Sequence, residues 1–111
     1  MRPSANKLIG VDLVEIRKAK SFYKAHRDCL SSFFTKQEIA YVRRNKRPYV
    51  SLAVLLAAKE AVFKAMGGAE GRLACFSDVC VMPGRNAGQK NDLKISFVVR
   101  KKYVVVQCAG I

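Results

Sequence analysis

The sequence predicts an α+β fold in which a small antiparallel sheet packs on a long buried helix. Two observations support this prediction. Runs of β-prone apolar residues occur near both ends of the chain, at Leu8–Val11, Leu93–Val99 and Tyr103–Cys108, and only three basic residues separate the last two runs. Between the ends lies a stretch rich in Ala and Leu, residues 52–66, which is apolar at all but three positions. Such a stretch is typical of a helix buried on every side.

Length and composition set the class of protein. The chain has 111 residues, of which 50% are hydrophobic, so we expect one domain, residues 1–111, with a hydrophobic core. The longest apolar stretch contains charged residues, which disfavours a membrane span. The segment Met1–Lys7 is not followed by the apolar h-region of a signal peptide, so we expect no signal peptide and a cytoplasmic location.

The charge balance predicts an anionic partner. The chain holds 21 Lys and Arg against 8 Asp and Glu, a net charge of +13. Such a field attracts nucleic acid, an acidic protein, a phosphorylated small molecule or a lipid surface. Few aromatic residues are interleaved with the basic ones and no nucleic-acid reader motif is present, so nucleic acid is disfavoured.

The cysteine pattern argues against a zinc site. Cys29, Cys75, Cys80 and Cys108 form no C-x-x-C pair, and no His stands beside Cys75 or Cys80. We therefore interpret the four cysteines as buried free thiols in a reducing compartment.

The N-terminal half is predicted to hold a strand and two helices. The strand Leu8–Val11 ends at Asp12, and residues 13–30 follow as a loosely periodic, basic amphipathic helix. Thr35 and Glu38 have the spacing of a capping box, which predicts a short helix as far as about Arg44.

The central helix is the clearest predicted element. Ser51 is its expected N-cap, the helix spans Leu52–Met66, and Gly67-Gly68 is expected to stop it. A Gly-rich turn, a strand at Cys75–Val81 and a polar loop at Pro83–Asp92 are expected before the C-terminal hairpin.

Glu60 is the only acid between residues 52 and 66. One interpretation is a surface ion pair with Lys64, which follows one helical turn later. The other is a site shared with a second acid, for which Asp12 at the end of the first strand is the candidate. Two carboxylates with a lysine nearby suit a Mg²⁺ ion that holds phosphate oxygens.

Three blocks of sequence resemble the holo-acyl-carrier-protein synthases of the 4′-phosphopantetheinyl transferase superfamily. They are Ile9-Gly10-Val11-Asp12-Leu13-Val14-Glu15-Ile16, Phe34-Thr35-x-x-Glu38, and Ala57-Ala58-Lys59-Glu60-Ala61-x-x-Lys64-Ala65-x-Gly67. The blocks occur in the family's order, and the resemblance covers roughly residues 8–81. The pairing of Gly-x-Asp with Lys-Glu-x-x-x-Lys is the specific part.

The resemblance implies an activity in fatty acid biosynthesis. Members of the family move phosphopantetheine from coenzyme A to a serine of apo-acyl carrier protein, using Mg²⁺, and form homotrimers with active sites between subunits. By motif match, Asp12 and Glu60 would be metal ligands, and Glu60 and Lys64 would be catalytic. Lys64, Gly67, Gly68 and Gly71 would bind coenzyme A.

The resemblance also gives the basic helix a role. Carrier proteins in this system are acidic, and Arg17, Lys18, Lys20 and Lys24 occupy the helix where the family docks its partner. The alternative is that these side chains only solvate a surface.

Two departures from the family pattern keep a second function open. Leu55-Leu56 stands where the family usually has Arg-Phe, and the segment over residues 82–95 is shorter than usual. The alternative to an active transferase is therefore a degenerate relative that binds coenzyme A or carrier protein without catalysing transfer.

Overall fold

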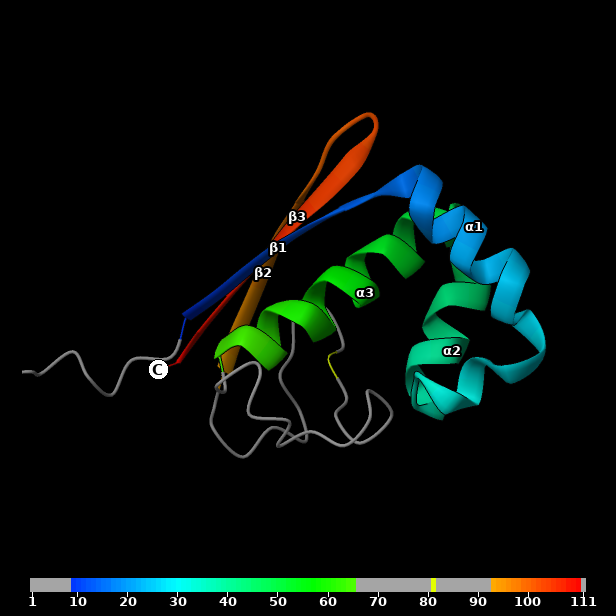
Figure 1. Cartoon of the computed structure of the whole chain (residues 1–111), viewed down its shortest axis with the longest axis horizontal. Helices are drawn as coiled ribbons and strands as arrows, with labels where there is room; N and C mark the ends of the chain where they lie inside the picture. The colour runs from blue at the N-terminus through cyan, green and yellow to red at the C-terminus, as the bar shows by residue number, and fades with distance from the viewer. Residues whose placement is uncertain (1–8, 66–80, 82–92, 111) are drawn as a thin grey trace, which may run out of the picture.

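The computed structural model describes residues 9–65, 81 and 93–110. Its elements, in chain order, are β1 (Ile9–Glu15), α1 (Ile16–His26), the 3-10 helix η2 (Arg27–Ser32), α2 (Lys36–Arg44), α3 (Pro48–Ala65), β2 (Leu93–Val99) and β3 (Tyr103–Gly110). The strands form one layer, α3 lies along that layer, and α1 and α2 pack around the N-terminal end of α3 (Figure 1). The predicted α+β fold is confirmed.

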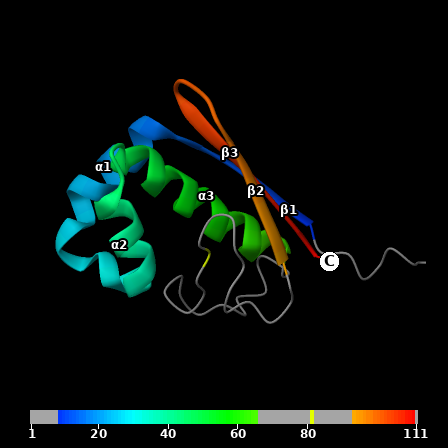
Figure 2. The same cartoon turned by 180° about the vertical axis from the view of Figure 1, so that it is seen from behind.

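The sheet has the strand order β1-β3-β2, and both neighbouring pairs are antiparallel. The C-terminal hairpin is therefore confirmed, with β3 as the central strand. Asp12 of β1 and Phe97 of β2 both lie opposite Val106 of β3. The view from behind also shows α3 lying along one side of the sheet (Figure 2).

The first strand is longer than the sequence indicated. β1 continues to Glu15, so the predicted start of a helix at residue 13 was wrong, and α1 begins only at Ile16. The cause is a tertiary contact. Residues 13–15 pair with residues 103–105 of β3, which holds them in the strand conformation. α1 also ends early, at His26, and η2 replaces its expected last turn with a kink at Cys29.

The two remaining helices differ in how well the sequence predicted their starts. Thr35 caps α2 with both hydrogen bonds of a capping box, as expected. α3 begins at Pro48, so the predicted cap at Ser51 was wrong; Ser51 lies inside the helix and is buried. Proline suits the first turn of a helix, where its missing N–H has no partner to lose.

α3 is the centre of the core, as predicted. It contacts β1 and β3 on one side and α1 and α2 on the other, and Leu52, Leu55, Val54 and Val62 are buried almost completely. Among the described residues, no helix combines the length and hydropathy that a membrane span requires.

Several predicted elements lie outside the described residues. They are the end of the central helix at Met66, the stop at Gly67-Gly68, the Gly-rich turn to Gly71, the strand at Cys75–Val81 apart from its last residue, and the loop at Pro83–Asp92. Val81 is described: it is buried and belongs to no helix or strand.

The described cysteines divide into two classes. Cys108 is buried and unpaired, as predicted, whereas Cys29 is exposed, so the prediction of four buried thiols was wrong at this position. Cys29 lies at the kink of η2, and its side chain faces solvent. Cys75 and Cys80 lie outside the described residues.

Candidate active site

β1 packs tightly against α3 at Gly10. The inner face of the strand carries Gly10, Asp12 and Val14, while Ile9, Val11 and Leu13 are exposed on the outer face. A Cβ atom on Gly10 would collide with the backbone carbonyl of Ala61. The absence of a side chain thus lets the backbones touch, and Asp12, two residues later on the same face, lies beside the helix.

Asp12 and Lys64 form an ion pair at this junction. The Lys64 Nζ donates to Asp12 Oδ1 at 3.0 Å and to the carbonyl of Val11 at 3.2 Å. The Asp12 side chain is 18% exposed and that of Lys64 53% exposed. The interpretation of Lys64 as the ion-pair partner of Glu60 was therefore wrong, because β1 places the Asp12 carboxylate within reach of the Lys64 ammonium.

Glu60 lies one turn before Lys64 on the same face of α3 and is half-buried. Within the described part of the chain, its carboxylate makes no hydrogen bond or ion pair. The structure thus brings Lys64 to Asp12 where β1 meets α3, and Glu60 lies one helical turn before Lys64 on α3.

The donor set suits Mg²⁺. No group of three or more His, Cys, Asp or Glu side chains gathers among residues 9–65, 81 and 93–110. Mg²⁺ commonly takes one or two carboxylates from the protein and fills its other positions with water and substrate phosphate oxygens. Asp12 and Glu60 could supply those carboxylates.

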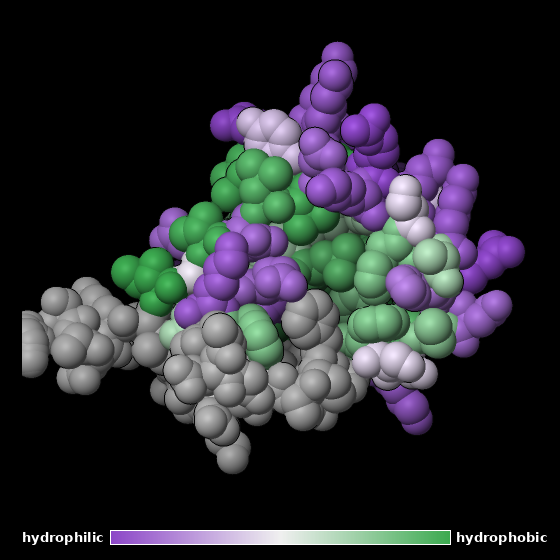
Figure 3. All heavy atoms as spheres, in the orientation of Figure 1, coloured by the Kyte–Doolittle hydropathy of each residue, from purple (hydrophilic) through white to green (hydrophobic). Residues whose placement is uncertain are grey.

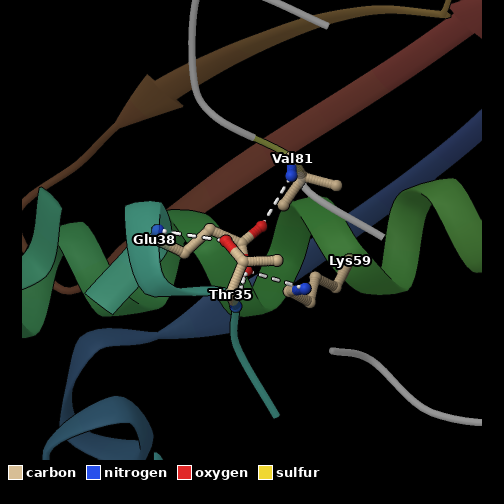
Figure 4. A network of polar contacts seen from close by, with 4 residues as sticks. All are labelled: Thr35, Glu38, Lys59 and Val81. Carbon is tan, nitrogen blue, oxygen red and sulfur yellow. Dashed lines mark hydrogen bonds and ion pairs between the residues drawn. The ribbon is translucent and has the colours of Figure 1, made fainter. Parts of the chain in front are cut away.

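A buried polar network next to Glu60 was missed by the sequence analysis. Glu38 was assigned only to the cap of α2, yet it is fully buried and its carboxylate accepts hydrogen bonds from Thr35, Lys59 and Val81 (Figure 4). A lysine at position 59 inside a largely apolar helix was the available signal, because a buried ammonium needs an anionic partner.

The basic residues of α1 face solvent. Arg17, Lys18, Lys20 and Lys24 are exposed, while Ala19 is buried against the core. Polar side chains crowd the end of the molecule formed by α1, α2 and the hairpin turn (Figure 3). The turn contributes Lys101 and Lys102, which line a surface hollow with Arg17, and this part of the basic surface was not predicted.

Of the residues assigned to coenzyme A binding, Lys64 lies at the junction described above. Gly67, Gly68 and Gly71 lie outside the described residues.

Sequence comparison finds relatives of known name. A holo-[acyl-carrier-protein] synthase from Chlamydia caviae is 39% identical over 75 residues, which are 67% of this chain and 62% of that protein. The synthase of Moorella thermoacetica is 44% identical over 63 residues, 57% of this chain and 49% of that protein. The aligned segments thus span about half to three fifths of these relatives' own length.

Comparison with solved structures finds the same fold in holo-(acyl-carrier-protein) synthases. A holo-(acyl-carrier-protein) synthase from Bacillus anthracis, in complex with CoA (3′,5′-ADP), has a TM-score of 0.76 at 22% identity and covers 93% of this chain and 94% of its own. The Helicobacter pylori synthase in complex with coenzyme A has a TM-score of 0.72 at 23% identity, over 91% of this chain and 97% of its own.

One further match extends over nearly the whole chain rather than over one motif. The family model of the 4′-phosphopantetheinyl transferase superfamily matches residues 8–107. Because this match covers nearly all of the sequence, the chain belongs to the 4′-phosphopantetheinyl transferase superfamily.

Proposed function

We propose that this protein is a holo-[acyl-carrier-protein] synthase, which transfers 4′-phosphopantetheine from coenzyme A to a serine of apo-acyl carrier protein. The observation that carries the proposal is the contact of Lys64 with Asp12 beside Glu60. The named relatives and the coenzyme A complexes of similar structures support it.

The reaction needs negative charge to be neutralised and two reactants to be aligned. The serine oxygen forms a bond to the phosphorus that carries the pantetheine arm, the bond from that phosphorus to the bridging oxygen breaks, and 3′,5′-ADP leaves. The proton of the serine hydroxyl is lost to a base. Lys64, whose ammonium is half exposed, would bind the phosphate oxygens and stabilise the charge that develops on them.

Asp12 and Glu60 would hold a Mg²⁺ ion at the same place. Their support is chemical: both are carboxylates, Asp12 is partly buried, and Glu60 has no hydrogen bond or ion pair within the described residues. When bound, the ion would offset the charge of the pyrophosphate. Gly67, Gly68 and Gly71 belong to the proposed coenzyme A site by motif match alone.

The acidic carrier protein would dock on α1. Arg17, Lys18, Lys20 and Lys24 are exposed on one helix that starts directly after β1, the strand of Asp12. A positive surface beside the reaction site raises the association rate of an acidic partner, and the effect weakens with salt.

A homotrimer would cover the apolar outer face of the sheet. Ile9 is 61% exposed, Leu13 52% and Val98 49%, a large apolar exposure for three neighbouring strands. Figure 3 shows hydrophobic side chains gathered along the sheet rather than along α1. Association of three copies through this face is consistent with the family's assembly.

One observation favours a second candidate, a relative that binds coenzyme A or carrier protein without transfer. Leu55 stands where the family usually has arginine, and its side chain is fully buried in the core. No cation is therefore supplied from this position of α3.

One incubation decides between these functions. The protein, coenzyme A, Mg²⁺ and a purified apo-acyl carrier protein from Moorella thermoacetica are combined, and the carrier is analysed by intact mass. We expect the carrier to gain one phosphopantetheine at its serine. Coenzyme A binding by calorimetry with an unchanged carrier mass would instead favour the non-catalytic relative.

A further inference from the structure

A buried ion pair joins α2 to α3 one residue before Glu60. The Lys59 Nζ lies 2.8 Å from Glu38 Oε1, and the two side chains are 2% and 0% exposed. The same oxygen accepts the Thr35 N–H at 2.9 Å, and Oε2 accepts the Val81 N–H at 2.6 Å (Figure 4). Both carboxylate oxygens are thus bound, and the network ties α2, α3 and residue 81 together.

Stability alone does not explain such a pair. The cost of removing two charges from water cancels much of their attraction, and apolar side chains of similar volume often serve a core as well. A buried ion pair adds a geometric constraint on the elements that carry it, because its charges and hydrogen bonds are satisfied in only one arrangement of the two side chains.

The apolar contacts of α3 lack this directionality. Many of its buried side chains are the single methyl group of alanine, including Ala53, Ala57, Ala58 and Ala61. Contacts made by alanine are not directional, so they constrain the rotation of the helix about its axis only weakly. Lys59 supplies a directional contact between α3 and α2.

That rotation determines where Glu60 points. Successive residues of a helix are about 100° apart around its axis, so Glu60 lies between Lys59 and Ala61. Lys59 is fixed to Glu38, and the backbone of Ala61 touches Gly10 of β1. With both flanks fixed, the face that carries Glu60 and Lys64 is turned to Asp12, where Lys64 forms its ion pair.

We propose that the Glu38–Lys59 pair is a positioning device for the active site: it sets the rotation of α3 that presents Glu60 and Lys64 to Asp12. Glu38 and Lys59 touch neither substrate nor metal in this account. The inference rests on the proposed transferase function.

The test uses three variants of the pair: Glu38→Gln, Lys59→Met and the double variant that carries both changes. Val42→Ala is the control. Val42 is buried in the same helix as Glu38 but lies outside the network, so its truncation lowers stability without touching the pair. Each single variant leaves the other residue of the pair buried without its partner, so it should lose both stability and turnover. The double variant should regain most of the stability, yet its kcat should stay at least tenfold below that of the unmodified protein, because nothing directional replaces the pair.

All rates are measured at a temperature at which circular dichroism shows every variant folded. The inference is overturned if the double variant regains full kcat, or if its kcat equals that of Val42→Ala. A second readout needs no turnover: the amide NMR signals of Asp12 and Lys64 should shift in the double variant and stay in place in Val42→Ala. If the unmodified protein transfers nothing, the proposed function fails, and these amide signals alone decide whether the pair positions α3.

Discussion

The ammonium of Lys64, near the end of α3, lies 3.0 Å from a carboxylate oxygen of Asp12 in β1, a residue 52 positions earlier in the chain. Both side chains reach solvent, so the pair contributes only about 0–1 kcal/mol to stability. Its value is geometric: it marks the point where a strand and a helix bring two charged groups of the proposed active site together.

Replacing Lys64 should separate activity from stability. Lys64→Met removes a half-exposed charge, so we expect a change of less than about 1 kcal/mol in the free energy of unfolding. Transfer to the carrier protein should fall by about a hundredfold or more, because the charge on the phosphate loses its counter-charge. Lys94→Met, an exposed lysine of β2, is the control and should leave both quantities unchanged. Full turnover of Lys64→Met would show that this lysine has no catalytic role.

Gly10→Ala should disrupt the strand–helix junction. The new methyl group would overlap the Ala61 carbonyl, and backbone atoms cannot yield as a flexible side chain does. We expect a loss of about 1–3 kcal/mol, the range typical of overpacked cores, together with a loss of turnover because Asp12 moves away from α3. Urea unfolding and transfer assays measure the two effects. A Gly10→Ala protein of normal stability would mean that β1 and α3 do not touch at this residue.

The basic face of α1 should control affinity for the carrier protein. Replacing Arg17, Lys20 and Lys24 by Gln should raise the KM for the carrier about tenfold or more at low salt and leave kcat nearly unchanged. The difference from the unmodified protein should shrink as salt is added. The matched control replaces exposed Arg43 and Arg44 at the end of α2 and exposed Lys46, which follows the helix. Equal effects of the two triple variants would indicate a general charge effect rather than docking on α1.

Cys108 should make stability depend on pH in the alkaline range. Burial raises the pKa of the Cys108 thiol above its ordinary value, because the thiolate is poorly solvated in the core. The unfolded chain therefore loses this proton at a lower pH than the folded protein does. The contribution of Cys108 is complete below the unfolded pKa of about 8.5 and is lost as the pH rises through that of the folded thiol.

The comparison with Cys108→Val isolates this effect from other alkaline titrations. Between pH 8 and 10 the free energy of unfolding should fall more steeply for the unmodified protein than for the variant. Identical slopes would contradict the raised pKa. In the folded protein, exposed Cys29 should also react with iodoacetamide well before Cys108, as peptide mass spectrometry would show.

Local signals in the sequence were enough to predict much of the fold. The capping box of Thr35 and Glu38, the apolar centre of α3 and the hairpin of β2 and β3 all depend on neighbours in the chain. The boundary between β1 and α1 does not. Leu13–Glu15 suits either state by sequence, and only its pairing with β3 makes it a strand.

In the candidate site too, some features could be predicted from local sequence and others required the tertiary structure. Asp12, Glu60 and Lys64 could be selected as oddities of charge in apolar surroundings and by resemblance to a family. The partner of Lys64 could not be predicted, because Glu60 in the same helix and Asp12 in a distant strand were both plausible until the close contact at Gly10 was known. The burial of Glu38 also required the tertiary structure, since a capping glutamate is normally exposed.

The most direct test of the transferase account is turnover of the unmodified protein beside Glu60→Gln, with coenzyme A binding measured on both. Glu60→Gln keeps the shape of the side chain but removes the charge proposed to hold Mg²⁺, and Asp28→Asn, an exposed acid in η2, is the control. We predict that the unmodified protein and Asp28→Asn convert apo- to holo-carrier protein, whereas Glu60→Gln still binds coenzyme A and transfers nothing detectable, because the charge acts mainly on the transition state. Equal turnover, or equal silence with coenzyme A bound by both, would contradict the account.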